Sequence, residues 1–284
     1  MAHRWTLESI DWQGFEPDKV TPELLATVKA AAIVEANSAD YVTYLHNIFP
    51  EDEEFKSAAA VWGEEEAQHG LALGRWAEMA DPDFSFEESL RLFREGYSLP
   101  LEAQESVRGS RTGELIARCV VESGTSSFYS ALRDATAEPV LRGICKHIAT
   151  DEFFHYRLFK THLQRYKERD RLSFLERLKI ALSRVQEAED DELAYAYFAA
   201  NILPRDADAE YDMEACAQAY WRQAMSYYRE RHIDNAARMI LRAADFNADG
   251  RIADFLSKVG WRLVAWRRDR LSRSATKGVE VAPS

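Results

Sequence analysis

The sequence predicts an all-α protein, a four-helix bundle with additional C-terminal helices. Glycine and proline together make up only 20 of the 284 residues, too few for a turn-rich β protein. Long stretches with apolar residues three or four positions apart, bounded by cap and breaker residues, indicate helices along most of the chain. A chain of this length can bury one large core.

Residues 21–168 are expected to hold the bundle itself. Thr21 precedes a proline, which is typical of a helix start, and Pro50 ends the same stretch. Ser85 opens a capping box and therefore a short extra helix. Residues 1–20 lack periodicity and are expected to form an irregular N-terminal arm. The long helices are expected at about 21–50, 52–80, 101–136 and 138–168.

The C-terminal part continues the helical pattern and ends in a polar tail. Residues 272–284 have too little apolar content to order themselves, so we expect a disordered tail. Residues 245–256, DFNADGRIADFL, begin like an EF-hand calcium loop but carry Leu256 where that loop needs glutamate. We interpret them as a turn between helices, and the chain 1–284 as a single domain. The additional helices within 169–271 are expected at about 171–200, 207–230, 231–244 and 251–271.

Composition restricts the class of protein. The net charge of −12 disfavours broad contact with nucleic acid, whose phosphates need a basic surface. Cys119, Cys145 and Cys216 lack CxxC spacing and are typical of small core residues in a reducing compartment. The apolar runs are too short to span a bilayer, and the N-terminus lacks the apolar core of a signal peptide. We expect a cytoplasmic protein with neither nucleic acid nor a membrane as partner.

Each of the four long helices places one glutamate in the middle of its apolar stripe. Residues three, four and seven apart share a helix face, and the residues at these distances from each glutamate are mostly apolar. Two of the four are followed by histidine in a Glu-x-x-His pattern, ending at His69 and His155. The glutamates are Glu35, Glu66, Glu122 and Glu152.

Buried carboxylates need a counter-charge. Each unpaired one costs several kcal/mol, so four would cost on the order of 10 to 20 kcal/mol, which rivals the stability of a whole domain. Two divalent cations would balance four carboxylates, with two imidazoles completing the ligand set, and this is the known pattern of di-iron or di-manganese bundles. The alternative is that the glutamates are solvated and the histidines are ordinary core residues. It would require the apolar face to be wrongly assigned on all four helices.

Asp151 and Glu65 each precede a glutamate of the pattern. We expect each of them to hold the imidazole N–H of the histidine on the partner helix. The alternative is that either of them simply faces solvent.

The motifs resemble those of the soluble acyl-[acyl-carrier-protein] desaturases, a branch of the ferritin-like di-iron superfamily. WGEEEAQHG, ATDEFFH and VEANSADYVTY are similar to the three segments that hold ligands in that family, and in ESGTSS a threonine follows the third-helix glutamate by three. The resemblance implies that two irons bind the six residues named above. It also implies that Thr125 lies beside the oxygen site, that Trp62, His69 and Asp151 belong to an electron route, and that a homodimer and a ferredoxin-type donor take part.

The chain also departs from that family. Ala67-Gln68 and Phe153-Phe154 replace polar pairs inside the two family motifs, which leaves the substrate and carrier docking open. Leu73 stands where the small subunit of ribonucleotide reductase has its radical tyrosine. Multicomponent monooxygenases place their threonine where this chain has Ser126. N-oxygenases and manganese at one position stay open, whereas a ferritin-like iron store would be a shorter chain.

The leading interpretation is a di-iron oxidase that desaturates a fatty acyl chain with dioxygen and two external electrons. A di-iron oxygenase acting on another small molecule and a non-enzymatic iron-binding protein are the alternatives. The basic segments 165–179 and 261–273 are expected to be solvated helix faces or docking sites for an acidic acyl carrier protein. Four aromatic residues are expected to wall an acyl channel or to form only core: Phe128, Tyr129, Phe153 and Phe154.

Overall fold

The computed structural model describes residues 4–187 and 191–279, with the side chains of all but the last six of these. The regular structure of this part is entirely helical, which confirms the predicted all-α class. Among the same residues, no helix is both long and apolar enough to cross a membrane.

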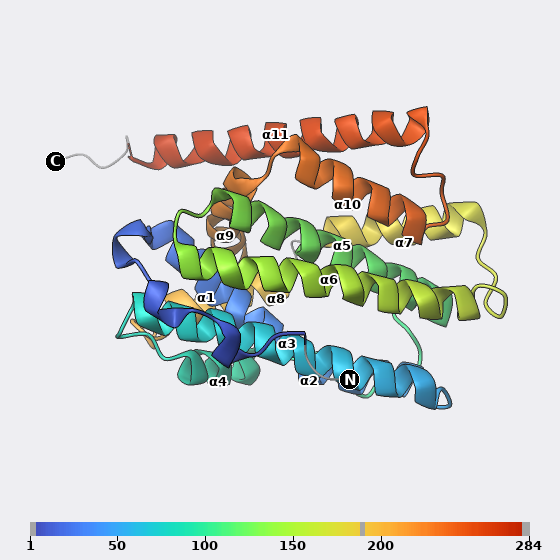
Figure 1. The fold of residues 1–284 in the computed structure, drawn as a ribbon, viewed down its shortest axis with the longest axis horizontal. Coiled ribbons are helices and arrows are strands. Elements are labelled where there is room, and N and C mark those ends of the chain that lie inside the picture. Colours follow the sequence, from blue (N-terminus) through green and yellow to red (C-terminus); the bar gives the residue numbers. More distant parts are fainter. Residues whose placement is uncertain (1–3, 188–190, 280–284) are drawn as a thin grey trace.

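Four long rods form the bundle (Figure 1). The helices α1 and α2 together form the first rod. Short turns connect the second rod to the first and the fourth to the third, so each pair is antiparallel. α5 packs along α6, whereas α3 packs against α1, α2 and α6. The bounds are α1 Pro22–Ala36, α2 Ser38–Ile48, α3 Glu53–Ala80, α5 Arg111–Ala135 and α6 Pro139–Tyr166, with the short α4, Phe86–Gly96, between the two pairs.

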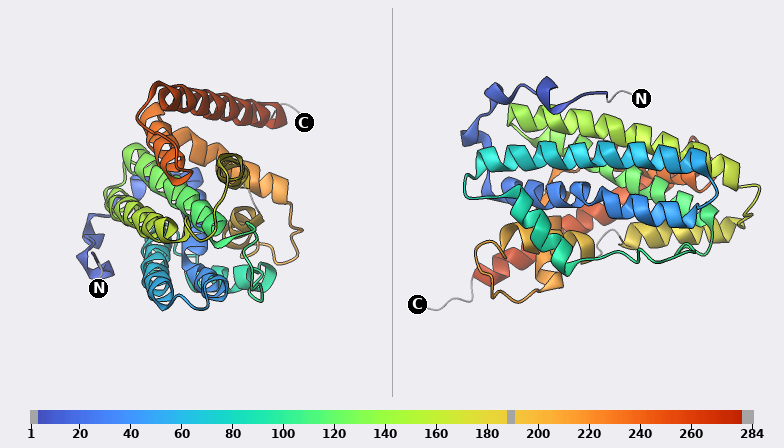
Figure 2. Two further views of the ribbon diagram at one scale, coloured as in Figure 1. Left: turned by 90° about the vertical axis from the view of Figure 1, so that its right-hand side faces the viewer. Right: turned by 90° about the horizontal axis from the view of Figure 1, so that it is seen from below.

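The remaining helices cover one side of the bundle. α8 packs on α1, α10 packs on α5, and α11 lies over α9 and α10. Figure 2 shows the N-terminal arm on a different side, next to α3 and α6. The arm is a series of 3-10 turns, η1 Leu7–Ser9, η2 Trp12–Gly14 and η3 Pro17–Lys19. The C-terminal helices are α7 Phe174–Gln186, α8 Asp191–Asn201, α9 Met213–Tyr227, α10 Glu230–Ala243 and α11 Arg251–Val279.

The first predicted helix is wrong in one respect, because it breaks at Asn37. The backbone of Asn37 leaves the helical conformation, with φ −83° and ψ 11°, and its N–H bonds to the carbonyl of Val34. The Asn37 side chain is buried and donates to Glu192 of α8, while the Ser38 hydroxyl donates to the Gly63 carbonyl of α3. Contacts with two other helices therefore stabilise the break.

Other boundaries also differ from the prediction. The third long helix begins at Arg111 rather than near 101, because Gly109 adopts a positive φ of 77° and Ser110 caps the helix. The predicted helix 171–200 is two helices, α7 and α8, and α9 starts at Met213 rather than 207. α11 continues to Val279 through most of the segment expected to be a disordered tail; residues 280–284 lie outside the described part.

The start and turn signals are correct. Thr21 and Ser85 cap their helices, since each side chain accepts a hydrogen bond from the third residue after it. The segment that begins like an EF-hand loop contains the turn between α10 and α11, as predicted, with Asp245 at a positive φ of 65°.

α1 and α3 approach each other backbone to backbone at Gly70. A Cβ added there would lie 2.7 Å from the Ala36 nitrogen and 2.9 Å from the Ala32 oxygen. Gly70 follows His69 and Ala36 follows Glu35, so this contact sets how closely the two candidate ligands approach.

We expect Gly70→Ala to destabilise the protein by about 1–3 kcal/mol, because backbone atoms of α1 must move to admit the methyl group. Gly143→Ala is the matched control. A Cβ at Gly143 in α6 meets nothing within 4 Å, so this change should be neutral or stabilising by up to about 1 kcal/mol. Urea unfolding of both variants measures the difference, and equal stabilities would contradict the close-contact account.

Candidate metal centre

The four stripe glutamates and the two histidines meet in the centre of the bundle. They come from four different helices, and each of the six is between 0 and 8% exposed. The structure therefore brings together the whole set that the sequence predicts as ligands: Glu35, Glu66, His69, Glu122, Glu152 and His155.

These side chains form two overlapping groups that could each hold a metal ion. In the first, Glu35 and His69 join Glu66 and Glu152. In the second, Glu122 and His155 join the same two shared glutamates. One donor atom from each member lies within 4.8 Å of the others in its group. The arrangement has two equivalent halves, each with one histidine and one glutamate of its own.

Both imidazoles are oriented from outside the cluster. His69 Nε2 lies 3.0 Å from Asp151 Oδ2, and His155 Nε2 lies 2.8 Å from Glu65 Oε2. Each acid thus contacts the histidine of the partner helix, the contact expected from the sequence. With the proton on Nε2, the lone pair of each Nδ1 points into the cluster, 3.3 Å from Glu152 Oε1 for His69.

Without a cation, the charges of this cluster oppose one another. Burial raises the pKa of Glu35 well above its usual range, and the Glu66 carboxylate raises it further. Burial and the neighbouring Glu152 do the same to the pKa of Glu122. Burial also acts to raise the pKa of Glu66, but the His155 imidazole holds it well below its usual range. When no cation is bound, protons and ion pairs must therefore compensate the buried charge.

Within the cluster, three buried ligand atoms make no hydrogen bond to any described residue: Glu122 Oε1, Glu152 Oε1 and His155 Nδ1. All three belong to the second group, where a cation would satisfy them together. A donor set of carboxylate oxygens and imidazole nitrogens suits iron or manganese. The residues present therefore fit a pair of metal ions.

Thr125 lies at the edge of the cluster. Its hydroxyl is 2.5 Å from Glu152 Oε2 and 3.3 Å from the carbonyl oxygens of Val121 and Glu122. A hydroxyl has one hydrogen to donate, and the shortest contact is to the shared glutamate. The hydroxyl therefore lies beside the site as expected, and the carbonyls of Val121 and Glu122 are more distant, competing acceptors.

The aromatic residues expected to wall a channel are placed differently. Tyr129 is buried, and its hydroxyl donates to Glu35 Oε1 at 2.5 Å, so it fixes a candidate ligand. Phe128 is buried core. Phe153 and Phe154 are 45% and 38% exposed and do not form an interior wall, because they follow Glu152 by one and two residues and so face away from its stripe.

Two residues of the N-terminal arm reach the site although the sequence pattern does not predict them. Arg4 forms ion pairs with both acids that hold the imidazoles. Its Nη2 lies 2.9 Å from Glu65, and its Nε lies 2.5 Å from Asp151. The Trp5 indole donates to Asp151 Oδ2 at 2.7 Å, and its ring stacks on His69 at 6.0 Å. The only signal in the sequence is an Arg-Trp pair, and a segment without periodicity assigns it to no face.

The resemblance assigns Trp62 to an electron route, and the structure places this side chain in a buried apolar cluster. Its ring packs edge-on against Phe159 at 5.5 Å, and its buried indole nitrogen has no hydrogen-bond partner. Trp5 is the tryptophan that reaches Asp151 and His69.

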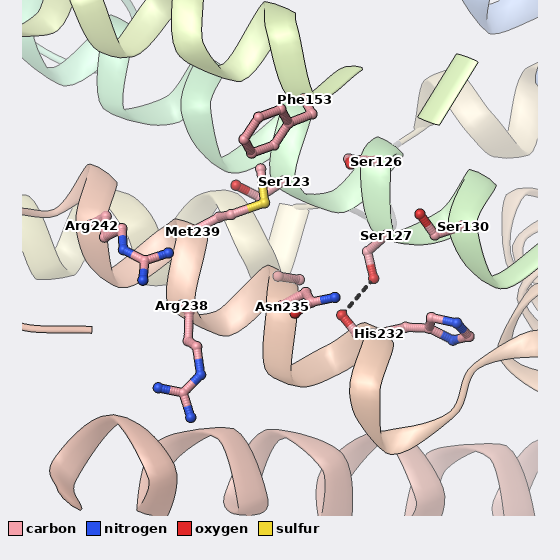
Figure 3. A pocket seen from close by; sticks show the side chains of 11 residues that line it. Ser123, Ser126, Ser127, Ser130, Phe153, His232, Asn235, Arg238, Met239 and Arg242 are labelled. Atoms are coloured by element: carbon pink, nitrogen blue, oxygen red, sulfur yellow. Dashed lines mark hydrogen bonds between the residues drawn. The ribbon is translucent and has the colours of Figure 1, made fainter. Parts of the chain in front are cut away.

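A pocket of about 300 Å³ with both polar and apolar lining opens between α5, α6 and α10 (Figure 3). The Ser127 hydroxyl donates to the backbone carbonyl of His232 at 2.9 Å, across the gap between α5 and α10. None of the six candidate ligands lines this pocket, which lies beside the cluster rather than within it. Its lining includes Ser123, Ser126, Ser127, Ser130, Asn235 and the side chain of Phe153.

A scan of the chain against protein-family models gives no match, and a comparison with curated proteins gives none either. The case for a metal centre therefore depends on the geometry of the side chains themselves.

We expect the shared and unshared glutamates to differ in their effect on metal stoichiometry. Glu66→Ala removes a donor from both groups and should abolish binding of both ions, whereas Glu122→Ala should leave the ion held by the His69 group. Glu64→Ala is the control, because Glu64 is the exposed neighbour on the same helix. Metal analysis after loading with Mn²⁺ measures the ratio, and equal losses in the first two variants would contradict sharing.

Removing the metal should lower stability. A ligand that binds only the folded state at 100 times its Kd stabilises it by about 2.7 kcal/mol. Glu122→Gln should remove most of the contribution from the second group while leaving the metal-free protein no less stable, since burial already disfavours the charged form. Thermal unfolding with and without a chelator tests both statements; a chelator-insensitive wild-type protein would contradict them.

Proposed function

We propose that this protein is an O₂-dependent di-iron oxidoreductase that introduces a double bond into a fatty acyl chain. The observation that carries the proposal is the pair of buried ligand groups that share Glu66 and Glu152. Two irons held there would supply the electrons that reduce dioxygen and so the oxidising power to break a C–H bond. The choice of acyl substrate follows the desaturase-like motifs.

The reaction balances with an external donor. The substrate gives up two hydrogens from adjacent carbons, and a ferredoxin-type protein supplies two electrons with two protons from solvent. One dioxygen then leaves as two water molecules. Manganese at one position is compatible with the same donor set.

The side chains of the site hold and orient the reacting groups. Asp151 and Glu65 fix the two imidazoles, and Tyr129 fixes Glu35. Thr125 keeps a hydroxyl proton at Oγ1 beside the shared Glu152. The cluster is buried, so bulk water is excluded from it while electrons and protons are transferred.

A chain of contacts supports a route for the electrons. His147 is partly exposed on α6, and its ring stacks on Trp5 at 5.1 Å. Trp5 bonds to Asp151, which bonds to His69. We propose this route in place of one through Trp62.

The outer face of α11 supports the docking of an acidic acyl carrier protein. Residues 251–273 carry seven basic and two acidic side chains, a net charge of +5 in a chain of net charge −12. The exposed apolar side chains on this helix give such a partner a contact surface between the arginines. They are Ile252, Phe255, Leu256, Leu263 and Trp266, which are 39–71% exposed.

A second candidate, an oxygenase acting on a small polar molecule, is favoured by the pocket beside α5. Its four serines and Asn235 could hydrogen-bond a polar group of such a substrate, while Phe153, Ala236 and Met239 supply apolar contacts. Hydroxylation or N-oxygenation needs the same pair of irons.

Product analysis separates these candidates. We expect iron-loaded protein, supplied with a ferredoxin-type reductant, dioxygen and acyl carrier protein thioesters, to yield acyl chains lighter by two hydrogens. Thr125→Val should lower turnover by about 10²-fold, and Thr125→Ser should restore it, because the hydroxyl returns. Thr150→Val is the control, since the Thr150 hydroxyl bonds only to its own helix. Products heavier by one oxygen would favour the second candidate.

A further inference from the structure

Two acids hold the histidines of the two halves, and one cation bridges these acids. Asp151 contacts His69 through Oδ2 and Arg4 through Oδ1. Glu65 Oε2 lies 2.8 Å from His155 Nε2 and 2.9 Å from Arg4 Nη2. Arg4 thus contacts both halves of the metal site at once, through the two acids that hold the histidines.

The guanidinium suits this position because its N–H groups point in fixed directions. Asp151 and Glu65 are 2% and 8% exposed, and they lie on neighbouring helices with like charge. Without a cation between them, repulsion would favour turning one carboxylate away from its imidazole. A planar fork that donates from Nε and Nη2 holds both orientations together, which a single ammonium group does not.

The arm that carries Arg4 is attached to the bundle at other points. The Arg75 guanidinium lies over the Trp12 ring at 4.2 Å, and the Phe15 ring packs edge-on against Trp76 at 6.2 Å. The Glu16 N–H donates to Glu138 Oε1 at 3.1 Å. Residues 12–16 of the arm are therefore held on the bundle by contacts that do not involve Arg4.

We infer that Arg4 is a positioning residue that couples the two halves of the metal centre, so that one side chain of the arm governs how firmly both ions are held. The inference rests on the proposed two-metal site. Linkage requires the reverse as well: bound metal must strengthen the contact of Arg4 with the two acids.

The test is the rate of metal release, which needs no catalytic activity. Wild-type protein and variants are loaded with Co²⁺, and a colorimetric chelator in excess takes up the ions as they leave. We expect Arg4→Gln to speed the release of both ions by about 3- to 10-fold, less than the ~10- to 100-fold loss of affinity that follows removal of a direct hydrogen-bond partner of a ligand. Arg4→Lys has one nitrogen and reaches one acid, so it should speed the release of only one ion.

Two further variants control for simple loosening of the arm. Arg75→Gln removes the cation over Trp12 but touches neither acid, so release should stay at the wild-type rate. Trp5→Phe removes one hydrogen bond to Asp151 and should speed release from the His69 half alone. Circular dichroism confirms that each variant is folded.

Three results would overturn the inference. If Arg4→Gln releases its ions at the wild-type rate, Arg4 does not act on the ions. If Glu66→Ala nevertheless loses its metal, the proposed metal site is still supported. Equal acceleration in Arg75→Gln and Arg4→Gln would indicate detachment of the arm instead. Wild-type protein that binds no Co²⁺, Mn²⁺ or Fe²⁺ would sink the proposed function together with the inference.

Discussion

Compensation of buried negative charge is the constraint on which the rest of this structure depends. Six carboxylates lie in or beside one core cluster: Glu35, Glu65, Glu66, Glu122, Asp151 and Glu152. Each would cost several kcal/mol if left alone, against a total stability of about 5–15 kcal/mol. The surrounding groups are accordingly donors: two imidazoles, the Tyr129 phenol, the Thr125 hydroxyl, the Trp5 indole and the Arg4 guanidinium. The carboxylates whose negative charge these groups do not compensate, together with the two imidazoles, form the donor set of a two-metal site.

The helix packing keeps these groups within reach of one another. Small residues let α1 and α3 approach at Gly70, and the break at Asn37 ends α1 just after Glu35. The C-terminal helices cover the side of α1 and α5, while the arm occupies the side of α3 and α6. One side of the bundle is thus packed by helices. The other side is closed by the short irregular N-terminal arm, whose Arg4 places a positive charge beside the site.

The cluster could be predicted from the sequence because a helix fixes which residues share a face. Glu66 and His69, three apart, must lie together, and the same rule places Phe153 away from Glu152. The break at Asn37 could not be predicted, since it depends on Glu192, far along the chain. Arg4 and Trp5 were missed because no periodicity orients an irregular arm. The resemblance points to Trp62, which lies on the stripe of Glu66, but a stripe runs the length of a helix and does not say which turn meets the site.

The bridge made by the arm also imposes an order on biosynthesis. Arg4 precedes both of its partners in the chain, since Glu65 follows it by 61 positions and Asp151 by 147. The pair with Glu65 needs only α3, whereas the pair with Asp151 cannot form until α6 has been translated. Until then Arg4 can pair only with Glu65, so the arm bridges the two halves of the site only after α6 has docked.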